Sequence, residues 1–462
     1  MQNTFLWEIA NSFSKPEQRE VRNFLASPFF NYREDVRALF EMLSNETEPP
    51  GKESVWAKVN PEKPFDDQQF RLLTSYLLKL LEQYLVYKEN QNDPVGNGHL
   101  LLSAYRRRKL PKHFEKAQKA VAKQLENQPL RHPEFYFENY LTANQQYLHL
   151  LESGRTKDLN LQKVETQLTT AVVAMKLRQS CLLRAHQAVF NTSYQIYLLD
   201  EMLALAEAPP YRNDPGVSMY RLCYQALFGE GSDALFLKFK EQLFWQDQQF
   251  PKAEMASLYL LAINFCIKKI NASQHQYLRE ALDLYKQGLK TELLLENGLL
   301  SRFAYNNIVG IALRLEQEWD WAGWFVGHYK DYLEPAQREA TFSLNAARIA
   351  YARQRYDDAL LHLQRADYKD LINSMVAKVL QLKIYFEKGE LELLDAHLRT
   401  MRMFVRRNKR MGYHHRNWQN IVHFTQKLVE LNPFDQQQRA ALKTAIEKEE
   451  VLTEKEWLLG QL

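Results

Sequence analysis

The chain has 462 residues, 45% of them hydrophobic and 25% charged, with a formal net charge of +4. This composition is ordinary for a folded soluble protein and excludes a chain too polar to bury a core, and the length allows two to four domains or one extended repeat array. Glycine (15 residues) and proline (16 residues) are sparse, so few positions suit hairpin turns, and helices are favoured over sheet.

A capping box marks the start of an early predicted helix. In "SKPE" (14–17), Ser14 stands at the N-cap position with Glu17 three residues later, and a proline lies in the first turn, where its missing N–H costs little. This pattern predicts a helix that runs to about Ala26.

The stretch "FLASPFFNYRED" (24–35) is interpreted as an elbow between two helices. Pro28 disfavours helical geometry at the residue before it, and "NYRE" repeats the capping box with Asn31 as the cap. We expect Phe29 and Phe30 to be buried where the hairpin folds back. An exposed aromatic docking site is the alternative.

A long amphipathic helix is predicted for residues 65–87. Apolar residues recur there at spacings of three and four, and Asp66 or Asp67 caps the N-terminus. The following "NQNDPVGNG" (90–98) combines an Asp-Pro pair with two glycines, which predicts a loop and a module boundary. We therefore expect residues 1–89 to form an N-terminal helical module.

A region of long helices is expected from residue 99 to residue 207. The stretch 156–208 contains neither glycine nor proline, which predicts two long helices with a break at "NTS" (191–193). A second boundary is predicted at "APPYRNDPG" (208–216).

The part of the chain from residue 215 to residue 430 repeats a helical pattern. Apolar or small residues stand at offsets of 0, 3, 7 and 10 from four starting positions, which lie 41, 37 and 35 residues apart: Leu278, Trp319, Tyr356 and Leu391. A drifting period around a fixed pattern indicates stacked helix pairs, each too small to bury its own apolar face. Residues 435–462 are expected to form a C-terminal capping helix that carries three apolar residues, Trp457, Leu458 and Leu459.

This pattern resembles the second helix of a tetratricopeptide repeat. A small residue is followed by a large apolar residue and then by another small one, and Gly310 lies 12 residues before Ala322, where that repeat has its first-helix glycine. The resemblance covers residues 256–402 and implies a concave surface that holds a partner peptide or helix. The whole chain, from "SPFFN" to "EWLLGQL", also resembles a group of uncharacterised bacterial helical-repeat proteins. The expected fold is thus all-α, an irregular right-handed α-solenoid of tetratricopeptide-like hairpins with an N-terminal helical module.

The cysteines and the N-terminus bear on the compartment. The three cysteines, Cys181, Cys223 and Cys266, lie in apolar helical patterns without any Cys-x-x-Cys, which predicts buried thiols in a reducing environment. Residues 1–15 lack the basic start and the continuous apolar core of a signal peptide. The longest apolar run (256–267) has 12 residues, too few to span a bilayer. We therefore expect a cytoplasmic protein without membrane contact.

No familiar catalytic or cofactor motif is found in the sequence. Gly96 and Gly98 lack the third glycine and the preceding strand of a dinucleotide site, and the P-loop, HExxH, GxSxG and calcium-loop patterns are absent. The one near cluster of histidines, His414, His415 and His423, lacks the spacing that aims two rings at a metal ion. We expect a non-enzymatic protein without metal or cofactor, the alternative being an enzyme whose site is scattered over distant helices.

A basic stretch lies between residues 396 and 429, which contain eight Lys or Arg and no acid. Seven of these cations form a candidate nucleic-acid-binding set: Arg399, Arg402, Arg406, Arg407, Lys409, Arg410 and Arg416. Phe404, Tyr413 and Trp418 are interleaved with them, and this combination suits a phosphate backbone with stacked bases, with "RRRKLPK" (106–112) as an extension. The alternative is a solvated helix face with buried aromatic rings, since the net charge is small.

A second candidate site follows from the repeat register. Counting back from Ala322, Ala359 and Leu394 to the first helix of each pair places six residues on or near the face that lines the concave side of tetratricopeptide repeats: Asn307, Arg314, Arg348, Tyr351, Lys383 and Phe386. Three cations on successive repeats favour an acidic or carboxylate-ended peptide. Solvated side chains, or neutralisation by acids such as Glu316 and Glu387, are the alternatives. The expected function is a protein-binding scaffold or adaptor, with a nucleic-acid-associated regulator as the alternative.

Overall fold

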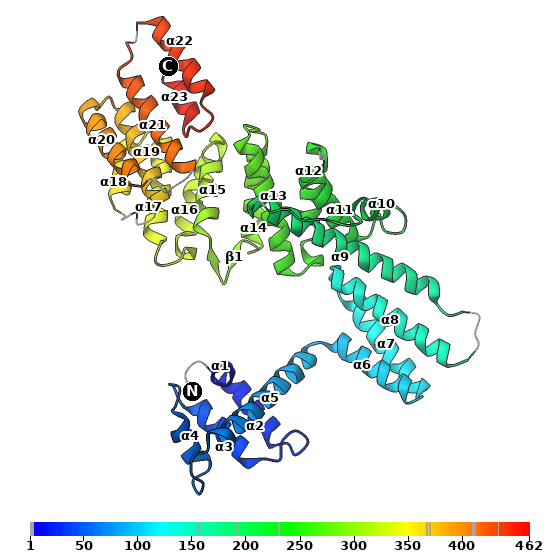
Figure 1. Cartoon of the computed structure of the whole chain (residues 1–462). Coiled ribbons are helices and arrows are strands. Elements are labelled where there is room, and N and C mark those ends of the chain that lie inside the picture. Colours follow the sequence, from blue (N-terminus) through cyan, green and yellow to red (C-terminus); the bar gives the residue numbers. More distant parts are fainter. Residues whose placement is uncertain are drawn as a thin grey trace. The chain divides into compact units, whose positions relative to one another are not determined.

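The computed structural model describes residues 4–154, 158–190, 192–229, 232–365, 368, 371–408, 413–432 and 434–462 (Figure 1). Helix accounts for 76% of the described residues, which confirms the all-α prediction. Strand in the described residues is limited to one antiparallel hairpin, β1 (Leu295–Glu296) with β2 (Leu299–Leu300). The chain divides into two compact units, unit 1 (residues 1–221) and unit 2 (residues 222–462).

Unit 1 begins with five helices around one apolar core. They are α1 (Phe5–Ser12), α2 (Lys15–Ala26), α3 (Glu34–Asn45), α4 (Lys52–Val59) and α5 (Asp67–Asn92). The rest of the unit comprises α6 (Pro94–Arg107), α7 (Pro111–Asn127), α8 (Pro133–Glu152), α9 (Leu161–Phe190), α10 (Leu199–Glu207) and the start of α11 (Pro215–Leu227). Helix α6 packs on α7, and α8 packs on α9.

Two of the predicted helix starts in unit 1 are confirmed. At α2 the Ser14 hydroxyl accepts from the Glu17 backbone N–H, and the Glu17 carboxylate accepts from the Ser14 backbone N–H at 2.8 Å. Helix α2 ends at Ala26, as predicted. At α5 the Asp66 carboxylate accepts from the N–H groups of the second and third helical residues. These side chains satisfy backbone donors that have no partner inside the helix.

The prediction that Asn31 caps the next helix is wrong. Helix α3 begins at Glu34 with Arg33 as its N-cap, and Asn31 is buried. The Asn31 amide donates to the carbonyl oxygens of Leu25 (2.9 Å) and Arg33 (3.0 Å). One of these carbonyls belongs to the last turn of α2, which lacks intrahelical partners, so Asn31 closes the preceding helix and does not open the following one.

The prediction of two buried phenylalanines in the elbow is wrong for Phe29. Its side chain is 83% exposed, whereas Phe30 is half-buried and stacks on Phe24 with ring centroids 4.1 Å apart. The backbone N–H groups of Phe30 and Asn31 both donate to the Ser27 carbonyl. This tight corner directs one ring toward the core and the other toward solvent.

The loop predicted at residues 90–98 is a junction of two helices. Asp93 separates α5 from α6 and caps α6, because its carboxylate accepts from the Gly96 N–H at 2.8 Å. Both glycines are helical. A Cβ added at Gly98 would lie 2.3 Å from the Val121 Cγ2 atom, so this glycine allows α7 to approach α6 closely. The Asp-Pro pair thus starts a helix, and Gly98 allows two helices to pack closely. The interpretation of this stretch as a turn included neither role.

A break between two helices was predicted at residues 191–193. Helix α9 ends at Phe190, and residue 191 is outside the described residues. The helix that follows, α10, has nine residues and is shorter than expected.

Unit 2 contains the remaining helices. They are α12 (Asp233–Trp245), α13 (Lys252–Asn271), α14 (Tyr277–Lys290), α15 (Arg302–Ala312), α16 (Trp319–His328), α17 (Arg338–Ala352), α18 (Tyr356–Gln364), α19 (Leu371–Glu387), α20 (Leu391–Arg407), α21 (Tyr413–Val429), α22 (Gln436–Lys448) and α23 (Lys455–Gly460). Short 3₁₀ turns accompany them, η1 (Asp247–Gln249), η2 (Glu316–Glu318) and η3 (Lys330–Tyr332).

Helices α13 to α20 pack as consecutive pairs. Helix α13 contacts α14, α15 contacts α16, α17 contacts α18, and α19 contacts α20 (Figure 1). The first helices of neighbouring pairs also touch, α15 with α17 and α17 with α19. Side chains on these first helices therefore lie next to one another although they are more than 30 residues apart in the sequence.

The repeat register corresponds to the buried face of each second helix. The residues at offset 3 are fully buried: Ala281, Ala322, Ala359 and Leu394. The residues at offset 7 are also buried: Tyr285, Val326, Leu363 and Leu398. Ala366, at offset 10 of the third repeat, lies outside the described residues. The pattern thus marks the positions where the second helix meets its partner, and small side chains there permit a close approach.

The three cysteines are buried free thiols. Cys181 lies in unit 1, and its thiol donates to the Tyr220 carbonyl at 3.7 Å. Cys223 and Cys266 lie in unit 2, and burial raises the pKa of the Cys266 thiol. Among the helices that the structure describes, none combines the length and the apolar character needed to cross a membrane.

Candidate functional site

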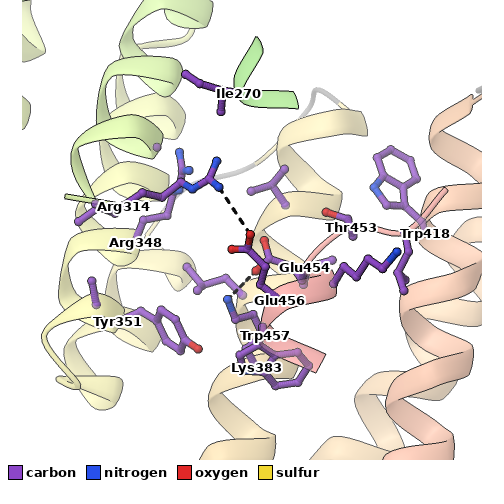
Figure 2. Close-up of a pocket in the computed structure, with 18 of the residues that line it drawn as sticks. Ile270, Arg314, Arg348, Tyr351, Lys383, Trp418, Thr453, Glu454, Glu456 and Trp457 are labelled. Carbon is purple, nitrogen blue, oxygen red and sulfur yellow. Dashed lines mark hydrogen bonds and ion pairs between the residues drawn. The ribbon is translucent and has the colours of Figure 1, made fainter. Parts of the chain in front are cut away.

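A hollow of about 710 Å³ in unit 2 collects residues from the first helices of the pairs and from the end of the chain (Figure 2). Arg314, which follows α15, Arg348 of α17 and Lys383 of α19 line it, as does Tyr351. Residues 452–457 form the opposite wall. We call residues 452–462 the C-terminal segment.

Four of the six residues predicted for the concave face line this hollow, and the other two lie elsewhere. Phe386 meets the C-terminal segment, with its ring centroid 5.5 Å from that of Trp457 in an edge-to-face contact. Asn307 is directed toward α14, where its amide donates to the Tyr285 hydroxyl at 3.5 Å. Its place on α15 puts it between the helices of adjacent pairs.

Lys383 forms the closest ion pair of the hollow. Its ammonium lies 2.7 Å from a carboxylate oxygen of Glu454, and its side chain is 12% exposed. The same ammonium lies 4.7 Å from the centroid of the Tyr351 ring and 5.6 Å from that of Trp457. The ammonium is therefore held by cation–π attraction to two rings and by an ion pair with a carboxylate.

Arg314 belongs to a more exposed group. Its guanidinium lies 3.7 Å from a carboxylate oxygen of Glu456 and 3.0 Å from His275 Nδ1. His275 Nε2 lies 3.6 Å from the same Glu456 oxygen. A guanidinium only donates, so Nδ1 accepts and the proton of a neutral His275 is on Nε2, facing the carboxylate.

Arg348 is held by polar groups of the fold. Its guanidinium donates to the Asn306 carbonyl at 3.1 Å and to the side-chain oxygen of Asn345 at 3.2 Å. A Cβ added at Gly310 would lie 2.8 Å from Arg348 Nη2, so the glycine makes room for this side chain. Burial lowers the pKa of Arg348, and the nearby Glu454 charge acts in the opposite direction. Arg348 has no carboxylate within ion-pair distance among the described residues.

Glu387 joins the pairs α17–α18 and α19–α20 to the C-terminal segment. Its carboxylate accepts from the hydroxyls of Tyr351 and Tyr356 and, at 2.6 Å, from the indole N–H of Trp457. Burial and the Glu387 charge raise the pKa of Tyr351. The alternative that acids neutralise cations of this face holds for Arg314 and Lys383, which pair with Glu456 and Glu454. Glu387 is not such an acid, since in the described residues it accepts from three neutral donors.

The C-terminal segment is the part of the site that sequence reasoning missed. Leu458 is fully buried in a core shared with α19, α20 and α21, and Trp457 packs at its edge. Just before the segment, the side-chain amide of Asn420 donates a hydrogen bond to the Val451 carbonyl at 2.9 Å. The acidic residues Glu454 and Glu456 are candidates for ion pairs with cations elsewhere in the chain. However, Lys383 and Glu454 are 71 residues apart, and no local pattern relates them.

The basic stretch is partly neutralised, and two of its aromatic rings face the core. Arg399 pairs with Asp395 one turn earlier, and Arg416 lies 3.4 Å from Glu449. Trp418 is buried and Phe404 is half-buried, both at the core shared by α19, α20 and α21. These two rings are not available to stack on bases. Lys409 and Arg410 lie outside the described residues, as does the side chain of Tyr413.

The remaining cations of the stretch are exposed. Arg402 and Arg406 line a hollow of about 350 Å³ between α20 and α21 together with His423, and Arg407 is exposed nearby. Burial lowers the pKa of His423, and the charges of Lys427 and Arg402 lower it further. The histidine ring is therefore mostly neutral at pH 7, and the arginines carry the positive charge of this surface.

No cluster of three or more His, Cys, Asp or Glu side chains suited to a metal ion occurs in the described residues. Comparisons of the chain with family models, with curated proteins and with solved structures find no match.

Proposed function

We propose that unit 2 is a non-enzymatic scaffold, an irregular α-solenoid of tetratricopeptide-like hairpins, which binds an acidic segment of another protein in the hollow lined by Arg314, Arg348 and Lys383. The observation that supports this most is the convergence of cations from three successive helix pairs on one hollow, where two of them already pair with carboxylates. The helix pairing and the contacts between first helices support the solenoid.

The chemistry of the hollow favours a ligand with carboxylates and an aromatic ring. Arg348 offers a fixed planar guanidinium, a geometry that suits a carboxylate. Lys383 lies beside aromatic rings, and Glu387 accepts an indole N–H. Hydrogen bonds to charged groups contribute about 1.5–3 kcal/mol each, so two or three of them are enough to select an acidic segment over a neutral one.

Synthetic peptides test the proposal. Twelve-residue peptides with one tryptophan and zero to four glutamates are titrated into the labelled full-length chain, and affinity is expected to rise with the number of carboxylates and to fall with salt. The double variant Arg314→Gln/Lys383→Gln should lose this dependence. Arg348 is left in place because its guanidinium bonds to the fold.

The matched control is Lys252→Gln/Arg399→Gln, which removes two exposed cations of unit 2 that do not line the hollow. It should bind as the unaltered chain does, and thermal melting checks that both variants fold. A folded hollow variant that keeps the full preference for acidic peptides would contradict the proposal.

A nucleic-acid-associated regulator is the alternative function. The observation in its favour is the exposed group Arg402, Arg406 and Arg407. If it binds phosphates, replacing these three by Gln should flatten the dependence of affinity on salt. Absence of RNA and DNA binding by the unaltered chain at low salt would exclude this function.

A further inference from the structure

The C-terminal segment contacts the hollow through two separate sets of side chains. The apolar set, Leu452, Leu458, Leu459 and Leu462, joins the core shared with α19, α20 and α21. The polar set, Glu454, Glu456 and the Trp457 indole N–H, meets Lys383, Arg314 and Glu387. Closing the end of unit 2 requires the apolar set alone. The polar set places two carboxylates and an indole on residues to which the proposed function assigns a ligand.

We infer that the C-terminal segment is an intramolecular stand-in for the partner, which must displace it, and that the partner presents the same groups in the same order, a carboxylate, a second carboxylate two residues later and an indole directly after it. This inference rests on the proposed function and adds to it the pattern of the ligand and the regulation of the site. Figure 2 shows Glu454 and Glu456 directed toward Lys383 and Arg314 across the hollow.

One carboxylate contact of the segment is exposed, and the other is made at a cost in backbone conformation. Glu456 is 75% exposed and lies 3.7 Å from Arg314, and exposed pairs of this kind contribute little. Glu454 has a left-handed backbone conformation with φ of 55°, which costs free energy for a residue other than glycine. The Glu454–Lys383 pair thus works against local strain.

A partner segment has one contact to gain that the C-terminal segment leaves unused. Arg348 lines the hollow and has no carboxylate within ion-pair distance among the described residues. A ligand that engages all three cations makes one more charge-assisted hydrogen bond than the chain's own segment does. The tethered segment has the advantage of an effective concentration of about millimolar order, so it excludes weak acidic peptides and yields to ligands of the full pattern.

The test uses the full-length chain and one defined probe, a fluorescein-labelled peptide with the sequence of residues 451–462, VLTEKEWLLGQL. The variant Glu454→Gln/Glu456→Gln weakens the contacts of the chain's own segment and leaves the three cations of the hollow in place. It should bind the peptide roughly tenfold tighter or more than the unaltered chain, because the apparent Kd equals the intrinsic Kd divided by the fraction of open molecules.

The matched control is Glu447→Gln/Glu450→Gln, which makes the same charge change at two exposed residues just before the segment. It should bind the peptide as the unaltered chain does. Equal affinity of all three chains would overturn the inference and leave the proposed function standing. No binding by any of them, with folding confirmed by thermal melting, would overturn both.

Hydrogen exchange supplies a readout that a purely structural role of the segment would not give. Saturating peptide should raise amide exchange in residues 452–462 of the unaltered chain, since the bound peptide expels them, while α17 and α19 stay protected. Bound peptide with unchanged exchange in these residues would show that it binds elsewhere and would overturn the inference.

Discussion

Phe29 and Phe30 are neighbours in the sequence with different environments, and they provide a matched pair for mutation. Phe30 stacks on Phe24 and borders the core of the first five helices, whereas Phe29 is exposed. Phe30→Ala should destabilise unit 1 by about 1–3 kcal/mol, less than for a fully buried ring. Phe29→Ala should stay within about 0.5 kcal/mol. Urea unfolding measures both, and equal losses would contradict the assignment of one ring to the core.

We expect His397 to make the stability of unit 2 dependent on pH. It is half-buried with Nε2 2.8 Å from the Lys378 carbonyl, and burial lowers its pKa below the ordinary 6.5. Below that value the unfolded chain binds more protons at this site than the folded one, so stability falls as pH drops from about 7 to about 5. His397→Gln should reduce this fall in urea titrations at the two pH values. An unchanged slope would mean that other groups, such as His362 and His423, account for it.

The residues at the start and end of α2 show what a local sequence pattern can predict. The Ser14 cap follows from a contact between residues three apart, and it is present as predicted. Asn31 satisfies the same spacing rule, but its amide reaches back six residues to Leu25, a contact that the forward pattern does not contain. Phe29 and Phe30 are chemically identical, so only the geometry of the corner separates them.

At the scale of elements, Ala359 tests the contact between the two helices of a pair. It is fully buried on α18, which packs on α17. Ala359→Leu adds three carbons where the helices approach closely and should destabilise unit 2 by about 1–3 kcal/mol. Ala253→Leu, the same change at an exposed position of α13, is the control and should stay within about 0.5 kcal/mol. Similar urea midpoints for both variants would argue against tight packing at this register.

Element type was predictable and element junctions were less so. Periodicity placed the second helices because the buried face recurs along one helix, and Ala281, Ala322 and Ala359 report it directly. The break at Asp93 was predicted as a loop and is a helix start, because Asp-Pro favours both turns and helix starts. Gly98 was missed because its role depends on Val121, which lies on another helix.

At the scale of the whole molecule, the limit of prediction lies in long-range pairing. The alignment of first helices brought Arg314, Arg348 and Lys383 to one hollow, since neighbouring pairs repeat the same geometry. The return of the C-terminal segment to that hollow follows no repeat and depends on where Leu458 finds a core. Asn307 does not line the hollow for a related reason, because its side chain contacts Tyr285 of the preceding pair.

The buried cysteines make the two units separately observable. Cys181 is in unit 1 and Cys266 is in unit 2, and both thiols are shielded in the folded chain. A short pulse of a thiol-specific reagent should label neither in native buffer. In rising urea, peptide mapping should give each cysteine its own labelling midpoint, because each unit has its own core. A single shared midpoint would mean that the units unfold together. The native sequence thus carries a chemical reporter in each half, and partial unfolding can be followed without adding a dye site or altering a residue.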